Sequence, residues 1–408
     1  MRLRRSLGLA AAVMLAACGS SSGASHPTPS HSPSAGATSS STPVAGAPFP
    51  SPTPVAGAVA PVSASCTAPP SAGDKLVLVN LRNVAGIIVR DITDIGHPAN
   101  RCKLTGGSYF RFISATRLSY IVTASSDQGA PGALYIFDMA TGATSLVRAW
   151  SYGGFGSWAY AWSPDGSHLT YIDSNSQQDM KWHLLSSAGD RLLSDLGPVP
   201  PRGVNADNDD LYVGFSADGQ YVAVETTFTQ GKGGATSSTA PLQVNHVSDG
   251  SPAYSNTQGA TMASWAGSGA RLYFRTTAGV QSWAPGGGVV TVSNGTAWIR
   301  PHASPDGSRM AFSLLNAQGN HVAEALDLTT ASGSIQQLSP SPRVGAIFAT
   351  ASLVWYAGET ICTTATPCGL GGPPLTGTTY IYDLGSGVEA GSIDTSFYDA
   401  WPHVVGQS

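Results

Sequence analysis

Short alternations of apolar and polar residues, separated by turn residues, fill the chain from about residue 74 onward. A period of two predicts β-strands, and no segment keeps a helical period. One phrase recurs, each time joining the end of an apolar run to an alternating run. Its copies are WSPDGSHLTYI at 162–172, FSADGQYVAVE at 215–225, WAGSGARLYFR at 265–275 and ASPDGSRMAFS at 303–313. The recurrence predicts one supersecondary unit that is used many times.

The Ser-Pro-Asp-Gly tetrapeptide suits a type I turn, because proline presets φ at the second position and glycine relieves the exit. The repeat resembles that of TolB-type β-propellers, in which a Pro-x-Trp/Phe-Ser-Pro-Asp-Gly turn joins the first two strands of each blade. PHASPDG at 301–307 fits best, with Ala303 in the aromatic position. Ala217 and Gly267 replace the proline in two other copies. The resemblance implies a propeller of four-stranded blades.

Counting the strands in fours predicts six blades, at 108–149, 157–196, 210–257, 260–293, 296–339 and 343–394. Three strands are left over near the amino end, at 75–80, 85–92 and 101–105, and one near the carboxyl end, Phe397 to Val405. Together they would form a composite seventh blade whose first strand comes from the carboxyl end. We therefore predict an all-β, seven-bladed propeller over 74–408, closed by both termini, with six and eight blades as alternatives. Such closure leaves that blade without an exposed edge.

The amino end has the features of a bacterial lipoprotein signal. Three of the first five residues are arginine, and the apolar run from Leu7 to Ala17 is too short to span a bilayer. The sequence LAAC at 15–18 resembles the lipobox of bacterial lipoproteins. In that family the cysteine becomes the acylated first residue, so we expect removal of 1–17 and palmitate-type lipidation of Cys18. The alternative is an ordinary secreted protein in which this cysteine is incidental.

Residues 18–73 consist mainly of Ser, Ala, Pro, Gly, Thr and Val. Such a segment buries too little apolar surface to offset its ordering entropy, which predicts a disordered tether. The protein would then be held at the cell membrane by its lipid, facing the extracytoplasmic side. An even set of exported cysteines indicates disulfides, and four permit three pairings. From the positions of the four in the predicted blades, we expect the pairs Cys66–Cys102 and Cys362–Cys368.

Loop length points to one face of the predicted propeller. The first-to-second and third-to-fourth turns are tight, whereas the second-to-third loops at 125–131, 173–180, 227–241 and 358–378 are long. Long loops on a rigid scaffold commonly carry function. We therefore predict a binding surface at the channel mouth on the long-loop face, where the innermost strands begin. Its candidate residues are Tyr109, Trp158, Asp210, Tyr212, Trp298, Arg300, Asp399 and Trp401. Each aromatic residue among them could instead belong to the packing between blades.

Composition and motifs favour binding over catalysis. The net charge is −4 and only 11% of residues are charged, so the sequence lacks the excess of basic residues that is typical of proteins that bind nucleic acid. No catalytic motif, metal site or cofactor is predicted, and His302 and His403, which share a repeat position, are expected in the core. These features predict a non-enzymatic binding or scaffold module for a protein, peptide or glycan partner in the envelope. The alternative is a propeller enzyme, lactonase-like or lyase-like, acting at the channel mouth.

Overall fold

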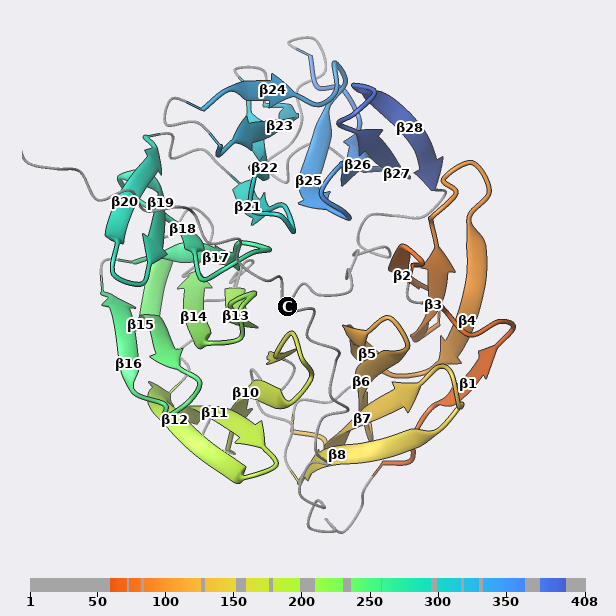
Figure 1. Ribbon diagram of the computed structural model, residues 1–408, viewed down its shortest axis with the longest axis vertical. Helices are drawn as coiled ribbons and strands as arrows, with labels where there is room; N and C mark the ends of the chain where they lie inside the picture. Colours follow the sequence, from red (N-terminus) through yellow and green to blue (C-terminus); the bar gives the residue numbers. More distant parts are fainter. Residues whose placement is uncertain are drawn as a thin grey trace, which may run out of the picture. The chain divides into compact units, whose positions relative to one another are not determined.

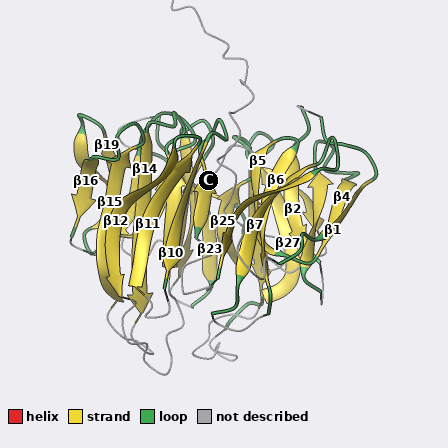
Figure 2. Cartoon of the chain, turned by 90° about the horizontal axis from the view of Figure 1, so that it is seen from below, coloured by secondary structure: helices red, strands yellow, loops and turns green. Residues whose placement is uncertain are grey.

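The structure is a computed structural model, and it describes most of the chain beyond residue 58. The described ranges are 59–71, 73–81, 84–125, 129–151, 159–175, 179–198, 210–229, 236–257, 259–294, 299–316, 319–329, 333–363 and 375–393. All regular elements in these ranges are strands, and they form seven four-stranded antiparallel sheets arranged in a ring (Figure 1). Figure 2 shows the strands running side by side along the direction of the ring axis. The prediction of a seven-bladed β-propeller is confirmed.

Blades one to six follow the chain in order, each with its first strand innermost (Figure 1). Blade one contains β5 (Ser108–Ser114), β6 (Arg117–Thr123), β7 (Gly132–Asp138) and β8 (Thr144–Trp150). Blade two contains β9 (Tyr160–Trp162), β10 (His168–Ser174), β11 (Asp179–Ser186) and β12 (Gly189–Pro198). Blade three contains β13 (Asp210–Phe215), β14 (Tyr221–Thr229), β15 (Thr236–His246) and β16 (Pro252–Asn256).

The next three blades have the same order. Blade four contains β17 (Thr261–Trp265), β18 (Leu272–Thr276), β19 (Gly279–Ala284) and β20 (Gly288–Ser293). Blade five contains β21 (Ile299–Ala303), β22 (Arg309–Leu315), β23 (His321–Asp327) and β24 (Ile335–Gln337). Blade six contains β25 (Arg343–Phe348), β26 (Leu353–Glu359), β27 (Leu375–Asp383) and β28 (Val388–Ile393). These bounds lie close to the predicted ranges.

The seventh sheet, here called the N-terminal blade, differs from the prediction at its outer edge. Its strands are β2 (Leu76–Asn80), β3 (Gly86–Asp91), β4 (Ala99–Thr105) and β1 (Ser63–Cys66), and their order in the sheet is β2-β3-β4-β1. The strand β1 falls within 18–73, which the sequence analysis assigned to the tether, so the folded part begins earlier than residue 74. Its four residues lack a strong apolar pattern, and pairing with β4 holds it in place.

A disulfide fastens β1 to the blade. Cys66 and Cys102 lie opposite each other in the antiparallel register of β1 and β4, and their sulfur atoms are bonded. The predicted pairing of these two cysteines is therefore present. Cys368 lies outside the described residues, so the pairing of Cys362 with Cys368 stays a prediction.

Removing the Cys66–Cys102 disulfide should destabilise the N-terminal blade measurably. The bond joins cysteines 36 positions apart, and a loop of that length predicts a loss of about 2–4 kcal/mol on the chain-entropy account. Urea unfolding of the Cys66→Ser/Cys102→Ser double variant against the oxidised parent measures this loss. Reductant should remove most of the difference between the parent and the variant, because any effect on the predicted Cys362–Cys368 bond is common to both proteins. Equal stability of the two proteins under oxidising conditions would contradict this role.

The N-terminal blade packs against both of its neighbours. Alternate residues of β2 face opposite sides: Val77 contributes to a cluster with Trp355 of blade six, and Leu78 to a cluster with Phe112 of blade one. Among the described strands, β2 pairs only with β3. The predicted first strand of the composite blade, Phe397 to Val405, lies outside the described residues, so closure by the carboxyl end stays a prediction.

Both faces of most strands are buried because the blades stack face to face. In β6, for example, Tyr120 packs toward the N-terminal blade and the next residue, Ile121, packs toward blade two. This alternation follows from the two-residue period of a strand. Large aromatic side chains such as Trp182 and Trp355 are completely buried in this way. The aromatic residues of the sequence therefore serve mainly to hold neighbouring blades together.

The recurring turn has the same hydrogen bonds in three of its copies. The hydroxyl groups of Ser163, Ser216 and Ser304 each donate to the aspartate two residues later at 2.6 Å. Each serine oxygen also accepts from the backbone N–H five residues later, at 2.8–3.0 Å. Burial alone would raise the pKa of Asp165 and Asp306, but these hydrogen bonds hold it below the ordinary value. In each of these copies, the serine and aspartate side chains therefore form hydrogen bonds within the turn itself.

The fourth copy of the turn, which contains Gly267, differs because the backbone of the next blade packs directly against it. A Cβ atom placed on Gly267 would lie 1.9 Å from the Cα atom of Pro305, which belongs to the turn of blade five. The N–H of Gly267 also donates to the carbonyl of Ser304 at 3.2 Å. Only glycine fits such a close approach of two backbones. The absence of proline from this copy is therefore a packing requirement between blades four and five.

Candidate binding site in the central channel

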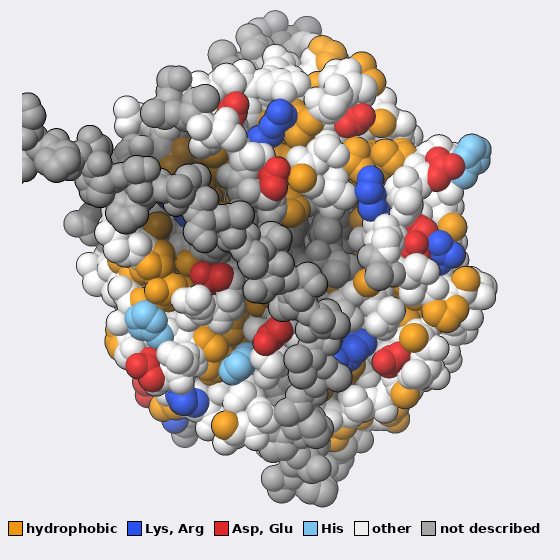
Figure 3. All heavy atoms as spheres, in the orientation of Figure 1, with side chains coloured by type: hydrophobic (Ala, Val, Ile, Leu, Met, Phe, Trp, Pro, Cys, Tyr) orange, Lys and Arg blue, Asp and Glu red, His pale blue; other side chains and the backbone are white. Residues whose placement is uncertain are grey.

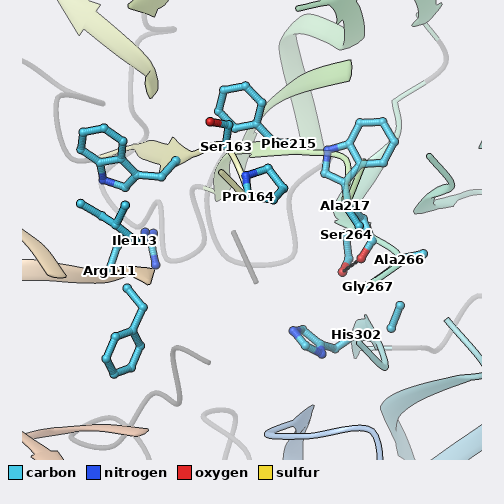
Figure 4. Close-up of a pocket in the computed structure, with 14 residues that line it drawn as sticks. Arg111, Ile113, Ser163, Pro164, Phe215, Ala217, Ser264, Ala266, Gly267 and His302 are labelled. Atoms are coloured by element: carbon cyan, nitrogen blue, oxygen red, sulfur yellow. Dashed lines mark hydrogen bonds between the residues drawn. The ribbon is translucent and has the colours of Figure 1, made fainter. Parts of the chain in front are cut away.

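The inner strands of the blades surround a hollow, here called the channel hollow. The described residues that line it come from β5, β9, β13, β17 and β21 and from the turns that follow three of these strands. They are Arg111, Phe112, Ile113, Trp162, Ser163, Pro164, Phe215, Ala217, Ser264, Trp265, Ala266, Gly267, His302 and Ala303. Figure 4 shows Arg111 and His302 on different sides of this space. The free space between these walls is narrow, with a cavity volume of about 40 Å³.

Tyr109 stands at the start of β5 in an unusual conformation. Its φ is +52°, in the left-handed region that non-glycine residues seldom adopt. The pairing of β5 with β6 shifts between Ser108 and Arg111, which marks a bulge at this point. Bulges re-aim side chains and are frequent beside functional sites. The side chain of Tyr109 is 45% exposed, a high value for an aromatic residue of an innermost strand.

The neighbouring blade supports this bulge. The hydroxyl of Tyr160, on β9, donates a short hydrogen bond to the carbonyl of Tyr109. The same hydroxyl lies 3.1 Å from the Oγ atom of Ser119. Burial raises the pKa of Tyr160, so the phenol stays neutral at physiological pH. The unusual backbone of Tyr109 is thus held by a buried donor from blade two.

Arg111 lies two residues further along β5, close to the buried Tyr160 and to the partly buried Tyr212. Its Nε atom donates to the carbonyl of Tyr160 at 3.3 Å, and its guanidinium carbon lies 5.8 Å from the centre of the Tyr160 ring. Tyr212 on β13 is also close enough to interact electrostatically with Arg111. Burial raises the pKa of Tyr212 and lowers that of Arg111. The three residues therefore form one group at the channel wall, with a single positive charge.

A second bulge occurs at the corresponding place in blade four. Met262 has a φ of +56°, and the pairing of β17 with β18 shifts between Thr261 and Ser264. The N–H of Ala263, next to the bulge, donates to Oε2 of Glu225 at 2.9 Å. Glu225 belongs to β14 of blade three and is 1% exposed. A buried carboxylate of one blade thus supports the bulged inner strand of the next.

His302 also joins two blades. Its Nδ1 atom accepts a hydrogen bond from the backbone N–H of Phe348 in blade six at 3.3 Å. Burial lowers the pKa of His302 to about 4, because the charged imidazolium would lose its hydration. The residue is therefore neutral at physiological pH. Its position fits the expectation of a histidine in the core, although its ring also lines the channel hollow.

Because His302 stays neutral in the folded protein, stability should fall between pH 6.5 and pH 4. In this window the unfolded chain, with an ordinary pKa of 6.5, gains a proton that the folded protein, with a pKa of about 4, does not. The full difference corresponds to about 3 kcal/mol. Asparagine at this position keeps an acceptor for the Phe348 N–H but does not titrate. We expect urea unfolding at pH 7.5 and pH 4.5 to show a smaller pH-dependent loss for His302→Asn than for the parent.

Comparing the parent with His302→Asn separates the effect of His302 on stability from the effects of other titrating groups. Burial also lowers the pKa of His168, which contributes to the pH dependence in the same direction. Because His168 is present in both proteins, its effect cancels in the difference between them. An identical pH-dependent loss in the parent and in His302→Asn would contradict the placement of a neutral His302 between blades five and six.

The structure brings together only part of the predicted mouth. Tyr212 belongs to the group around Arg111. Tyr109 instead borders a separate hollow beside the loop between β2 and β3. The backbones of Asp210 and Arg300 lie in the inner strands β13 and β21, but their side chains are not described. Four further candidates lie outside the described residues, and their roles stay predictions: Trp158, Trp298, Asp399 and Trp401.

Four residues in or beside the inner strands were not predicted from the sequence. Arg111 lines the channel hollow, whereas Tyr160, Glu225 and Met262 belong to the bulged strands or to the contacts that support them. A signal existed for two of them, because Arg111 and Glu225 are the single charged residues of their strands, SYFRFIS and YVAVETTFT. A charge in a strand buried on both faces implies a polar partner or a cavity. The bulge at Met262 carries no comparable signal in the sequence.

The long loops are shorter than predicted in one blade. The range 227–241 was expected to be a loop, but β14 continues to Thr229 and β15 begins at Thr236. The correction follows from the β-branched residues at both ends of that range, which extend the hairpin. The ranges between β10 and β11 and between β26 and β27 do connect second and third strands, as predicted.

Charged groups are spread thinly over the described surface. On the face in Figure 3, acidic and basic side chains are scattered, some of them next to one another, and neither sign gathers into one patch. Within the described ranges, no three His, Cys, Asp or Glu side chains are placed to hold a metal ion. A search of the same ranges finds no helix long and apolar enough to cross a membrane.

Comparisons with known proteins reveal similarity in structure only. No protein-family model and no curated protein matches the chain. TolB from Acinetobacter baumannii is 15% identical over 78% of this chain, with a TM-score of 0.41, and this chain spans 64% of its length. TolB from Agrobacterium tumefaciens is 17% identical over 65% of this chain and 87% of its own, with a TM-score of 0.35. The periplasmic gluconolactonase PpgL from Pseudomonas aeruginosa is 14% identical over 80% of this chain and 97% of its own, with a TM-score of 0.47.

These solved structures thus include two TolB proteins and one protein that is named as an enzyme. At these identities the likeness is one of fold, and the fold itself rests on the seven blades of this chain. The chain is similar to TolB-type propellers in the turn that its blades repeat and in the ring that these blades form.

Proposed function

We propose that this protein is a lipid-anchored envelope protein whose propeller binds a protein, peptide or glycan partner at the channel mouth. The observation that carries the proposal is Tyr109. It is an exposed aromatic residue on an innermost strand, held in a left-handed conformation by Tyr160 of the next blade. Backbone strain of this kind costs about 1–3 kcal/mol and persists where the surrounding structure enforces it, commonly at binding sites.

The chemistry around Tyr109 suits recognition. Tyrosine and arginine are the side chains that most often dominate binding energy at interfaces. Here both come from one strand, since Arg111 follows Tyr109 on β5 and lies against Tyr160 and Tyr212. Contact with Tyr160 restricts the arginine, so little side-chain entropy is lost when a partner binds.

Sequence and structure agree with an exported location. The LAAC sequence ending at Cys18 supports a lipid anchor, and the 18–62 segment is long enough to hold the propeller away from the membrane. The Cys66–Cys102 disulfide supports an oxidising compartment, because such bonds persist mainly outside the cytoplasm.

Capture of a partner from envelope extract tests the proposal. The bait is the full chain carrying Cys18→Ser, compared with the same bait carrying either Tyr109→Ser or Val290→Ser. Val290 lies on the outer strand β20 and is 50% exposed, close to the value for Tyr109, so it serves as a matched control. We expect one partner to bind the parent and the Val290 variant but not the Tyr109 variant. Equal capture by all three baits would contradict binding at the channel mouth.

The same preparation tests the alternative of a propeller enzyme. Lactone hydrolysis or glycan cleavage by the purified chain, lost on treatment with a chelator, would overturn the non-enzymatic proposal. Stoichiometric metal in the purified protein would point in the same direction, because lactonases and lyases of this architecture would use it at the channel axis.

Replacing Cys18 with serine should release the protein from the membrane. Serine cannot form the thioether that carries the lipid, and no other anchor is proposed. Fractionation of cells that produce the parent and the Cys18→Ser variant measures the effect, with a Ser20→Ala variant as the control for a substitution beside the predicted lipidation site. A Cys18→Ser protein that stays fully in the membrane fraction would contradict the lipoprotein assignment.

A further inference from the structure

A groove, here called the turn groove, lies between blades two and three. Its walls are the hairpin that joins β11 to β12 and the turns that join β13 to β14 and β15 to β16. The strands β12 and β15, which lead into these walls, lie side by side in the ring (Figure 1). The cavity volume is about 660 Å³, which falls in the range of small-molecule sites. Tyr109 lies at the start of a first strand, whereas these turns follow first and third strands, so the groove and Tyr109 are on opposite faces.

Arg191 reaches from blade two to blade three at this groove. Its Nη1 atom donates to the carbonyl of Ser248 at 3.3 Å. A Cβ atom placed on Gly250 would lie 3.0 Å from Cδ of Arg191, so the aliphatic part of the side chain lies against this glycine. No ion pair joins Arg191 to a carboxylate within the described ranges. Because a guanidinium carries five N–H groups, donors remain for a ligand.

His168 supplies an acceptor to the same groove. The hydroxyl of Ser167 donates to Oδ2 of Asp165 at 2.7 Å, so its oxygen accepts the N–H of His168 Nδ1 at 2.8 Å. Burial lowers the pKa of His168, and the charge of Arg191 lowers it further against the opposing effect of Asp165. The ring is therefore neutral at physiological pH, and the lone pair lies on Nε2.

Blade three contributes two further polar side chains to the groove. The amide of Gln220 is exposed and forms no hydrogen bond with the described residues, so it offers both a donor and an acceptor. The ring of His246 packs against that of Tyr221, with the ring centres 4.9 Å apart. Buried Leu184 and Val247 provide apolar surface between these polar groups.

The charges at the groove balance one another. Among the described residues that line it, Asp190 is the one carboxylate. Burial alone would raise the pKa of Asp190, but hydrogen bonds, first that from His183, hold it below the ordinary value, so the group is ionised. Arg148 is shared between Asp190, at 3.3 Å, and Asp173, at 2.8 Å. Together with Arg191 these groups carry no net charge, which favours a neutral ligand over an anion.

The corresponding groove between blades four and five is different. Its cavity volume is about 400 Å³, and Val290 and Val292 are among the residues that line it. Arg271, at the position of His168 in the repeated turn, donates to Ser282 of its own blade at 3.1 Å. The combination of a large space with available donors and acceptors is therefore a property of the turn groove and not of every gap between blades.

We propose that the turn groove binds a neutral saccharide. Arg191 and Gln220 donate to sugar hydroxyl groups, and Nε2 of His168 accepts from one. The apolar surface between them contacts the C–H face of a sugar ring. Since each sugar hydroxyl both donates and accepts, a saccharide uses both kinds of group in the wall without bringing a charge. The site is separate from the mouth around Tyr109 and does not depend on a partner there.

Calorimetry with defined sugars tests this site on the full chain. The probes are maltose, cellobiose and N,N′-diacetylchitobiose, with inorganic phosphate and D-glucose 6-phosphate for comparison. We expect at least one neutral disaccharide to bind more tightly than either phosphate compound. Binding of the phosphate compounds alone would show an anion site and overturn the proposal, as would the absence of binding by every probe.

A second measurement distinguishes a glycan chain from a free sugar as the source. The protein is run in native gels that contain amylose, hydroxyethylcellulose or glycol chitin, the polymers that correspond to the three disaccharides. Retardation by the polymer of the disaccharide that binds identifies a glycan chain. Binding of the disaccharide without retardation identifies a free sugar.

Three variants assign the binding to the turn groove. Arg191→Ala should weaken the disaccharide about tenfold or more, and Gln220→Ala by a few-fold, the effects of losing a charged and a neutral hydrogen bond. Both side chains are exposed, so both variants should fold, which thermal unfolding checks. Arg271→Ala, in the groove between blades four and five, is the control and should bind as the parent does. Unchanged affinity in both Arg191→Ala and Gln220→Ala would overturn the proposal. Tyr109→Ser should leave saccharide binding intact, which separates this site from the proposed mouth.

Discussion

Replacing Gly267 with alanine is expected to destabilise the propeller by about 3 kcal/mol or more, the upper end of the effect of overpacking. The added Cβ would lie 1.9 Å from the Cα atom of Pro305 and 2.2 Å from its carbonyl atoms. These are backbone atoms of the next blade, so the turns of blades four and five would have to move apart. Gly267→Pro, which restores the proline of the repeat, should be worse, because it also removes the hydrogen bond from N–H to the carbonyl of Ser304.

The corresponding turn of blade three provides a matched control. Ala217 occupies the same position in the turn of blade three, and its N–H donates to no backbone carbonyl of the described residues. Ala217→Pro should therefore change the free energy of unfolding by less than about 1 kcal/mol, and could raise it by restricting the unfolded chain. Urea unfolding of the three variants against the parent measures both effects. Equal stability of Gly267→Pro and Ala217→Pro would contradict the close contact between the two turns.

Deleting residues 396–408 is expected to make the domain insoluble or strongly destabilised. The sequence predicts that Phe397 to Val405 supplies the first strand of the composite blade, and β2 pairs only with β3 among the described strands. In blades two to six, the inner strands contact one another from β9 through β13, β17 and β21 to β25. Without a strand beside β2 that inner wall would be interrupted, and an exposed edge favours aggregation.

A shorter deletion distinguishes the effect of losing the predicted strand from the effect of merely shortening the carboxyl end. Removing only 406–408 leaves Phe397 to Val405 in place and should keep the melting temperature of the parent. Thermal unfolding and soluble yield of both truncations measure the difference. A protein lacking 396–408 that melts at the temperature of the parent would show that the ring does not need this segment.

The sequence predicted the blades because their signals are local and repeated. The alternation of each strand and the Ser-Asp turn that follows it can be recognised without tertiary contacts, so blades one to six were located closely. The strand β1 could not be recognised, since Ser63–Cys66 has no apolar pattern and becomes a strand through its partner β4. The extension of β14 and β15 was missed for a related reason, because threonine and serine suit both a loop and a hairpin.

The candidate site was harder to predict than the fold. Tyr109 was chosen from its place in the repeat, but its left-handed backbone depends on a hydroxyl from blade two. Position 267 requires glycine because Pro305, 38 positions later in the chain, packs against it. Such features arise from the contact between blades, and a single sequence does not encode that contact in any local pattern. The lone charges Arg111 and Glu225 were the only local signs of the channel wall.

The most direct test of the account is a photochemical cross-link from the channel mouth. The photoreactive residue p-benzoylphenylalanine replaces Tyr109 in one bait and Val290 in another, and both baits are irradiated in intact envelopes. The account predicts a discrete cross-linked partner from position 109 and none of the same mass from position 290. The same partner cross-linked from position 290 but not from 109 would place binding on the outer rim, and would contradict recognition at the channel mouth.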